Sequence, residues 1–235
     1  MIKPRALTSL SIFFPCYNEA LNVGAMIEQA VKVGETYGVD YEIVVVDDGS
    51  RDHSAEIVRG WSSKNPKVRL VQHSQNMGYG AALRTGLKNV TKDLVLLTDG
   101  DNQFHLNEIE KLFSKIDSCD VVVGYRIQRQ DKAYRRFNGF LWTRTVRFLF
   151  GLKIRDIDCA FKLFRRKALD GLELKSDYLL IHAEIVARLK KKGCRIEEIG
   201  VNHYPRTAGK ATATALGSVI KSLKELFLLY WQIRN

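Results

Sequence analysis

The sequence has few cysteines and no long apolar run. The four cysteines are widely separated and lack metal-ligand spacing: Cys16, Cys119, Cys159 and Cys194. We therefore expect free thiols in a reducing compartment, with neither a disulfide framework nor a zinc site. No apolar stretch approaches the roughly 20 residues of a membrane-spanning helix, and residues 1–9 lack the apolar core of a signal peptide. We expect a cytoplasmic protein without a transmembrane span.

Acidic residues are also scarce relative to basic ones. The 235 residues include 26 Asp and Glu against 37 Lys and Arg, which gives a formal net charge of +11. That charge favours an acidic partner, such as nucleic acid, an anionic membrane surface or a phosphorylated small molecule. Because no helix-turn-helix, zinc-finger or RNP-type pattern is present, we expect no nucleic-acid partner.

Apolar runs alternate with amphipathic segments over the first 125 residues. Strands are predicted at 10–14, 41–46, 68–72, 94–98 and 121–124, and helices at 18–33, 54–61, 80–89 and 106–116. The strands lack polar alternation, which is typical of a parallel sheet buried on both faces. The order of these elements predicts a doubly wound α/β fold with a parallel sheet.

The second half of the sequence is more basic. We predict a helix at about 140–150, a strand at 161–164, a helix at 181–192 and a closing strand at 195–201. An apolar helical pattern covers 216–231. We expect one catalytic domain over residues 1–212 and a C-terminal amphipathic helix over residues 213–235. That helix packs on the domain, forms a homodimer contact, binds a membrane-protein partner or lies in a membrane interface.

Acidic and glycine-rich turns follow the predicted strands. They occupy residues 16–19, 47–50, 76–80 and 99–103. In open α/β sheets, ligands bind at the carboxyl edge of the strands, where all four turns would meet. Their shared position predicts a site for a nucleotide phosphate.

The turn after the fourth strand carries two carboxylates, Asp99 and Asp101, around Gly100. Paired acids at the end of a core strand repel each other and lose hydration unless a cation meets them. A hard divalent cation with oxygen ligands would do so and would hold a diphosphate. Gly100 allows close approach of that ligand, and Gln103 adds a neutral oxygen.

Cations and aromatic side chains alternate over residues 132–155. The pattern fits a packed helix with a solvated basic face, or a surface for anionic lipid or a lipid-linked phosphate. Farther along, Arg206, Gly209 and Lys210 lie in a loop that either orders over a bound phosphate or is a solvated linker.

Seven motifs in order resemble a known family. They are FFPCYNEA, VVVDDGSRD, NMGYGAAL, TDGDNQF, GYR, DIDCAFKLFRR and YPRTAGK, between Ser11 and Lys210. The set is similar to family 2 glycosyltransferases of GT-A fold, in particular the branch with dolichyl- and polyprenyl-phosphate sugar transferases. The resemblance implies a Rossmann-like, mostly parallel sheet with helices on both faces, and transfer of a sugar from a nucleotide-sugar donor.

The resemblance also implies roles for individual residues. Donor-binding positions are Pro15, Tyr17, Glu19, Val46, Asp48, Asp99, Gly100, Asp101, Arg206 and Lys210. Metal-binding positions are Asp99, Asp101 and Gln103, for Mg²⁺ or Mn²⁺. Arg126 matches an arginine near the donor sugar or the acceptor phosphate. The family's loop has a serine before its lysine, whereas here Lys210 follows Gly209 directly.

Two acceptors fit these residues. A lipid phosphate is already an anion and needs no base, and with GDP-mannose as donor this interpretation places the protein at the cytoplasmic face of a membrane. A UDP-sugar with a sugar-hydroxyl acceptor would instead need a carboxylate to take the proton, either Asp156 or Asp158. The basic aromatic segment favours the lipid phosphate.

Other α/β functions match less well. The first strand is followed by PCYNEA and not by the G-x-G-x-x-G of a dehydrogenase. A nucleotidyltransferase would have a glycine-rich basic loop at that point. A protein that binds a nucleotide sugar without catalysis is the remaining alternative.

Overall fold

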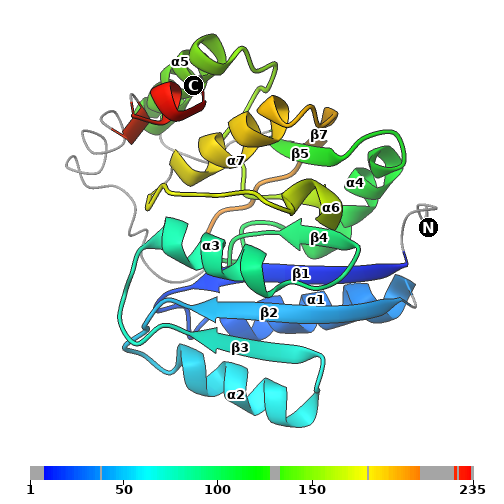
Figure 1. Ribbon diagram of the computed structural model, residues 1–235. Helices are drawn as coiled ribbons and strands as arrows, with labels where there is room; N and C mark the ends of the chain where they lie inside the picture. Colours follow the sequence, from blue (N-terminus) through cyan, green and yellow to red (C-terminus); the bar gives the residue numbers. More distant parts are fainter. Residues whose placement is uncertain are drawn as a thin grey trace.

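The computed structural model describes residues 8–37, 39–127, 133–178, 180–206, 225–226 and 228–233. The described residues form a seven-stranded sheet in the order β3-β2-β1-β4-β6-β5-β7 (Figure 1). The strands are β1 (Ser9–Cys16), β2 (Asp40–Asp47), β3 (Val68–Gln72), β4 (Leu94–Leu97), β5 (Val121–Arg126), β6 (Lys162–Arg165) and β7 (Ile196–Val201). Each predicted strand is present, which confirms the α/β fold class.

The sheet is mostly parallel, as predicted, with one reversed strand. β1 pairs in parallel with β2 and β4, and β5 pairs in parallel with β7. β6 is antiparallel to both β4 and β5. The first residue of β6, Lys162, pairs with Leu97 at the end of β4, so β6 enters the sheet from its carboxyl edge. The sheet is therefore mostly parallel, and the segment before β6 lies along the edge where ligands bind in this fold class.

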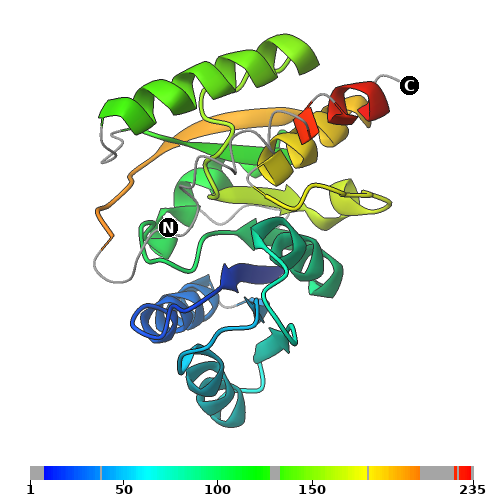
Figure 2. The ribbon, with the colours of Figure 1, turned by 90° about the vertical axis from the view of Figure 1, so that its left-hand side faces the viewer.

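Helices cover both faces of the sheet. One face packs against α1 (Val23–Tyr37), α2 (Ser54–Lys64), the short 3₁₀ helix η1 (Leu106–Glu108) and α4 (Ile109–Ile116). The other packs against α3 (Tyr79–Asn89), α5 (Ala133–Phe150), α6 (Arg166–Leu169) and α7 (Leu180–Lys191). Figures 1 and 2 show α1 and α3 on opposite sides of β1. Side chains of β1 alternate between the two cores, Ile12 facing one and Phe13 the other.

Three predicted helices differ in extent. α1 begins at Val23 and not at residue 18, because Asn18 adopts a positive φ of 55° and the backbone turns before the helix starts. The predicted helix at 106–116 divides into η1 and α4. α5 begins at Ala133, seven residues earlier than predicted.

The C-terminal segment is described only in part. Residues 225–226 and 228–233 are helical, and Leu226 and Leu229 are buried against the core that includes α7. The rest of the predicted helix at 213–235 lies outside the described residues, so the division at residue 212 stays a prediction. Among the described helices, none is long and apolar enough to cross a bilayer.

Two helical glycines give a matched test of this packing. A Cβ at Gly86 of α3 would lie 2.3 Å from the Phe13 ring, whereas a Cβ at Gly60 of α2 meets nothing within 4 Å. We expect Gly86→Ala to lower the free energy of unfolding by about 1–3 kcal/mol. Gly60→Ala should raise it by about 0.4–1 kcal/mol, because alanine loses less backbone entropy on folding. Urea titrations of both variants would measure the difference, and equal midpoints would contradict the α3–β1 contact.

Candidate active site

The loops that follow β1, β2 and β4 meet at the carboxyl edge of the sheet. β1 and β4 are adjacent, with Phe13 opposite Leu97, so the loop after each strand emerges at the same place. A Cβ at Gly100 would lie 2.6 Å from the carbonyl oxygen of Pro15. Glycine is thus required where the D-x-D turn touches the end of β1. Sequence analysis had assigned Gly100 to close approach of a ligand, and the structure shows close approach of the chain itself.

Arg206 joins the loop after β1 to the loop after β4. Its Nη2 donates to Oδ2 of Asp101 at 2.7 Å, and its Nη1 donates to Oε1 of Glu19 at 2.8 Å. Asp101 is buried and also accepts from the backbone N–H of Gln103 at 3.2 Å. Three residues predicted for the donor site, far apart in sequence, therefore meet as one ion cluster.

Burial makes the acid pair costly when it is ionised. Burial, followed by the nearby charge of Asp99, raises the pKa of Asp101 to about 6, although Arg206 opposes the shift. Burial likewise raises the pKa of Asp99. A carboxylate with a raised pKa is stabilised by any cation that reaches it.

The chemistry of this donor set suits a divalent cation shared with a ligand. Within the described ranges, no group of three or more His, Cys, Asp or Glu side chains is arranged to hold a metal by itself. Mg²⁺ is typically held by one or two carboxylates together with substrate phosphates, and Asp99 and Asp101 provide such a pair. Gln103 uses its Nε2 to donate to the carbonyl oxygen of Tyr204 at 3.0 Å, so its predicted metal contact stays a prediction.

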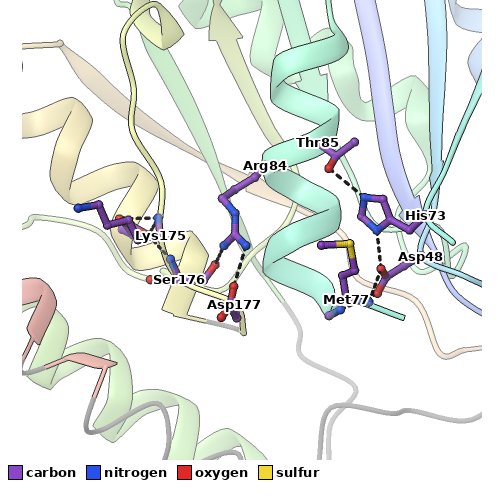
Figure 3. Close-up of polar contacts among 10 residues, drawn as sticks. Asp48, His73, Met77, Arg84, Thr85, Lys175, Ser176 and Asp177 are labelled. Carbon is purple, nitrogen blue, oxygen red and sulfur yellow. Dashed lines mark hydrogen bonds and ion pairs between the residues drawn. The ribbon is translucent and has the colours of Figure 1, made fainter. Parts of the chain in front are cut away.

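Asp48 binds the protein's own backbone. Its carboxylate accepts from the N–H groups of Met77 and Gly78, each at 2.9 Å, and contacts Nδ1 of His73 at 2.7 Å (Figure 3). Nε2 of His73 in turn lies 2.9 Å from Oγ1 of Thr85. The Asp48 carboxylate therefore holds the loop at 76–78 against the sheet edge, and its predicted contact with the donor stays a prediction.

The same loop is held from its other side by the segment before α7. The N–H of Gly80 donates to the carbonyl oxygen of Asp177 at 2.9 Å, and Arg84 donates to the Asp177 carboxylate at 2.7 Å (Figure 3). A Cβ at Gly80 would lie 2.3 Å from the carbonyl oxygen of Ser176. The loop at 76–80 is thus fixed between β2 and α7.

The two apolar residues among the predicted donor positions have buried side chains. Val46 is fully buried within β2, and Pro15 is buried within β1. A ligand at this edge can therefore meet them only through backbone atoms. Tyr17 is half-buried in the loop after β1. Lys210 lies outside the described residues, so its predicted role is untested.

The two candidate bases, Asp156 and Asp158, lie in the segment before β6 and have different partners. Asp156 accepts from Nε and Nη2 of Arg126 at 2.6 and 2.7 Å, and both side chains are nearly buried. This forked ion pair commits Asp156 to Arg126. Asp158 instead accepts from Nε1 of Trp142 at 3.2 Å, and burial, followed by the charge of Asp156, raises its pKa from 3.8 to about 6. Of the two acids, Asp158 is the one able to accept a proton.

Tyr79 lies against Asp99, with His182 and Lys162 behind it, and the sequence alone predicts no role for these three residues. Tyr79 donates its hydroxyl to Oδ1 of Asp99 at 2.7 Å and contacts His182, which contacts Lys162. The charges of Lys162, Arg126 and Arg206 all act on Asp99. These contacts place the acid pair, Arg126 and Arg206 within one site. The only sequence signal for Lys162 and His182 is a polar residue within an apolar segment.

The arrangement defines an α/β protein with an acid pair and several cations at the carboxyl edge of its sheet, the features of an enzyme that acts on phosphate-bearing ligands. The sequence model described as Glycosyl transferase family 2 matches residues 11–172. The chain belongs to this family and is a glycosyltransferase. The predicted family and enzyme class are confirmed.

Solved structures of glucosyl-3-phosphoglycerate synthase from Mycobacterium tuberculosis share the fold. The complex with phosphoglyceric acid has 16% identity and a TM-score of 0.72, over 96% of this chain and 80% of that one. The complex with Mn²⁺ and UDP-glucose has 15% identity and a TM-score of 0.71, over 96% and 79%. These matches confirm the GT-A fold. The matched enzyme is not a member of the dolichyl-phosphate branch that the sequence predicts.

The raised pKa of Asp158 predicts a pH-dependent cost in stability. Since the folded-state pKa of about 6 exceeds the ordinary 3.8, ionised Asp158 destabilises the fold above pH 6, and the cost vanishes below about pH 4. Asp158→Asn should therefore raise the free energy of unfolding by about 1–3 kcal/mol at pH 7 and leave it unchanged near pH 4. Urea titrations at the two pH values would test this. A difference independent of pH would show that Asp158 is not desolvated.

Proposed function

We propose that the protein transfers a sugar from a UDP-sugar to a hydroxyl group of its acceptor, with Asp158 as the general base. The observation that carries this proposal is the position of Asp158. The negative charges of Asp99, Asp101 and Asp158 all raise the pKa of Tyr79, so the candidate base lies in the same cluster as the acid pair. An acid with a pKa of about 6 suits proton transfer near neutral pH.

The donor end would use the acid pair and Arg206. Asp99 and Asp101 would hold Mg²⁺ or Mn²⁺, which when bound supplies a Lewis acid for the diphosphate. Arg206 neutralises Asp101 in the structure. Once another cation meets Asp101, the guanidinium is released from that carboxylate and can pair with phosphate oxygens, for which its planar fork is well matched.

The acceptor end would use Asp158, Trp142 and Arg126. Trp142 donates a hydrogen bond to Asp158 and orients its carboxylate. The other oxygen of that carboxylate can accept the proton of a bound hydroxyl. Arg126 is held by Asp156 in a bidentate pair, which fixes its position beside the base. Breaking such a buried pair costs about 3–5 kcal/mol, so Arg126 is a rigid part of the site.

The bound molecules of the similar structures support the choice of donor. Glucosyl-3-phosphoglycerate synthase is found with Mn²⁺ and UDP-glucose, and with Mn²⁺, UDP and glucosyl-3-phosphoglycerate. We therefore favour a UDP-sugar over the GDP-mannose expected from the sequence. A hydroxyl acceptor that carries an acidic group would also suit the net charge of +11.

Isothermal titration with UDP-glucose, UDP-N-acetylglucosamine and GDP-mannose would test the donor, each with Mn²⁺ and with EDTA. We expect Mn²⁺-dependent binding of a UDP-sugar. Asp101→Asn should reduce that binding at least tenfold with the fold retained, because removing a carboxylate from a paired site weakens cation binding. Asp170→Asn, which removes an exposed surface acid paired with Arg166, is the control. Binding that is equal in EDTA, or unchanged in Asp101→Asn, would contradict the proposal.

A second candidate function is transfer to a lipid phosphate at a membrane surface. The supporting observation is the outer face of α5, where Phe140, Leu141 and Phe148 are 63%, 52% and 86% exposed. Beside them, Arg144, Arg147 and Arg155 line a pocket of about 570 Å³. Exposed aromatic and aliphatic side chains next to cations suit an anionic lipid surface.

Vesicle co-sedimentation would test the lipid-phosphate candidate. We expect the protein to bind vesicles that contain phosphatidylglycerol and not vesicles of phosphatidylcholine alone. Phe148→Ser should weaken this binding about tenfold, because burial of a phenyl group contributes about 1.5–3 kcal/mol. Leu21→Ser, at a residue 78% exposed in the loop before α1, is the control. Absence of vesicle binding would exclude the candidate.

A further inference from the structure

A row of polar side chains runs from the protein interior to Asp99. Nζ of Lys162 lies 3.3 Å from Nδ1 of His182, and Nε2 of His182 lies 2.9 Å from the Tyr79 hydroxyl. That hydroxyl lies 2.7 Å from Oδ1 of Asp99. Lys162 and His182 are fully buried, on β6 and α7, while Tyr79 is the first residue of α3. Three elements that are far apart in sequence thus build one path to the acid.

The direction of each hydrogen bond follows from the donors available. Lys162 lies within reach of three acceptors, the carbonyl oxygens of Ile157 and Cys159 and Nδ1 of His182. Three acceptors match the three hydrogens of a protonated amine. Because Nδ1 of His182 accepts, its hydrogen is on Nε2 and is donated to Tyr79. The single hydrogen of Tyr79 is then left for Asp99.

The electrostatic environment agrees with this assignment. Burial and the nearby charges of Lys162 and Arg126 hold the pKa of His182 well below its usual range, so the ring is neutral with one N–H. A neutral imidazole donates at one nitrogen and accepts at the other. Every donor in the row is therefore directed toward Asp99, and hydrogen bonds arranged in series strengthen one another.

We propose that Tyr79 is a positioning residue for Asp99, and that Lys162 and His182 fix its hydroxyl hydrogen on Oδ1. The hydrogen bond sets the plane of the carboxylate and presents the other oxygen in one orientation to a divalent cation. The inference rests on the proposed function, in which Asp99 helps to hold that cation. Neither the family match nor the fold comparison assigns a role to these three residues.

A purely structural role explains the row less well than a role in positioning Asp99. Burying the charge of Lys162 is costly, and a well-packed apolar side chain in its place is often as stable as a buried charged group or more so. The β6–α7 contact is already filled by apolar residues such as Phe164 and Ile185. The structure thus keeps a buried cation where packing does not require one, at the end of a path that leads to Asp99. Metal-binding residues commonly depend on such supporting hydrogen bonds.

Tyr79→Phe tests the proposal because it removes only the hydroxyl. We expect the dissociation constant for Mn²⁺, measured by isothermal titration both without nucleotide and with UDP-glucose present, to rise about 10–100-fold. The unfolding midpoint in urea should change little. Tyr41→Phe removes the hydroxyl of another buried tyrosine, whose ring stacks with Lys67 away from the acids, and should leave Mn²⁺ binding unchanged. Equal Mn²⁺ affinity in Tyr79→Phe and wild type would overturn the proposal.

Two substitutions at His182 separate positioning from packing. Glutamine can accept from Lys162 and donate to Tyr79 with one amide group, whereas leucine can do neither. We expect His182→Leu to weaken Mn²⁺ binding as Tyr79→Phe does, and His182→Gln to recover most of it. Equal loss in both variants would overturn the relay through His182. If wild type itself bound no Mn²⁺ with or without UDP-glucose, the proposed function would fail instead.

Discussion

The site depends on the cost of placing two carboxylates, Asp99 and Asp101, at the end of a core strand. Burial raises the pKa of both, so the ionised pair is stable only with positive charge nearby. Arg206 meets Asp101 directly, and the charges of Lys162 and Arg126 reach Asp99. Each cation comes from a different part of the chain. Because the acid pair needs positive charge nearby, the site combines residues from β5, β6 and the segment after β7.

The reversed strand β6 makes this arrangement possible. If β6 ran parallel to its neighbours, the segment before it would enter the sheet at the amino edge, far from the acids. Because β6 begins opposite Leu97 at the end of β4, residues 156 and 158 lie at the carboxyl edge and Lys162 lies behind Asp99. The antiparallel strand and the segment before it therefore contribute the candidate base, the partner of Arg126 and the buried cation. The sequence predicts a mostly parallel sheet and a strand at 161–164, but not the direction of that strand.

The parts of the site that the sequence could predict are those that follow strands directly. Apolar runs end at Asp47 and at Thr98, and the rule that parallel strands share a carboxyl edge brings the acids together without further knowledge. The same reasoning could not distinguish Asp156 from Asp158. They are the same residue type two positions apart, so only their neighbours in the folded structure differ. The neighbours Arg126 and Trp142 come from β5 and α5. Likewise, Tyr79, His182 and Lys162 meet only through tertiary packing, which the periodicity of the sequence does not predict.

Arg206 has one set of partners in this structure and would have another in the proposed reaction. Its guanidinium already bridges Asp101 and Glu19, so the two carboxylates share one positive charge before any ligand arrives. A divalent cation carries twice the charge of a guanidinium and needs no hydrogen-bond geometry, so it competes for Asp101 most effectively when phosphate oxygens complete its coordination. In the proposed function, the donor diphosphate would provide those oxygens and would also be the group that a released Arg206 binds. Metal and donor would then favour each other's binding at this edge, because each would remove a cost that the other would meet alone.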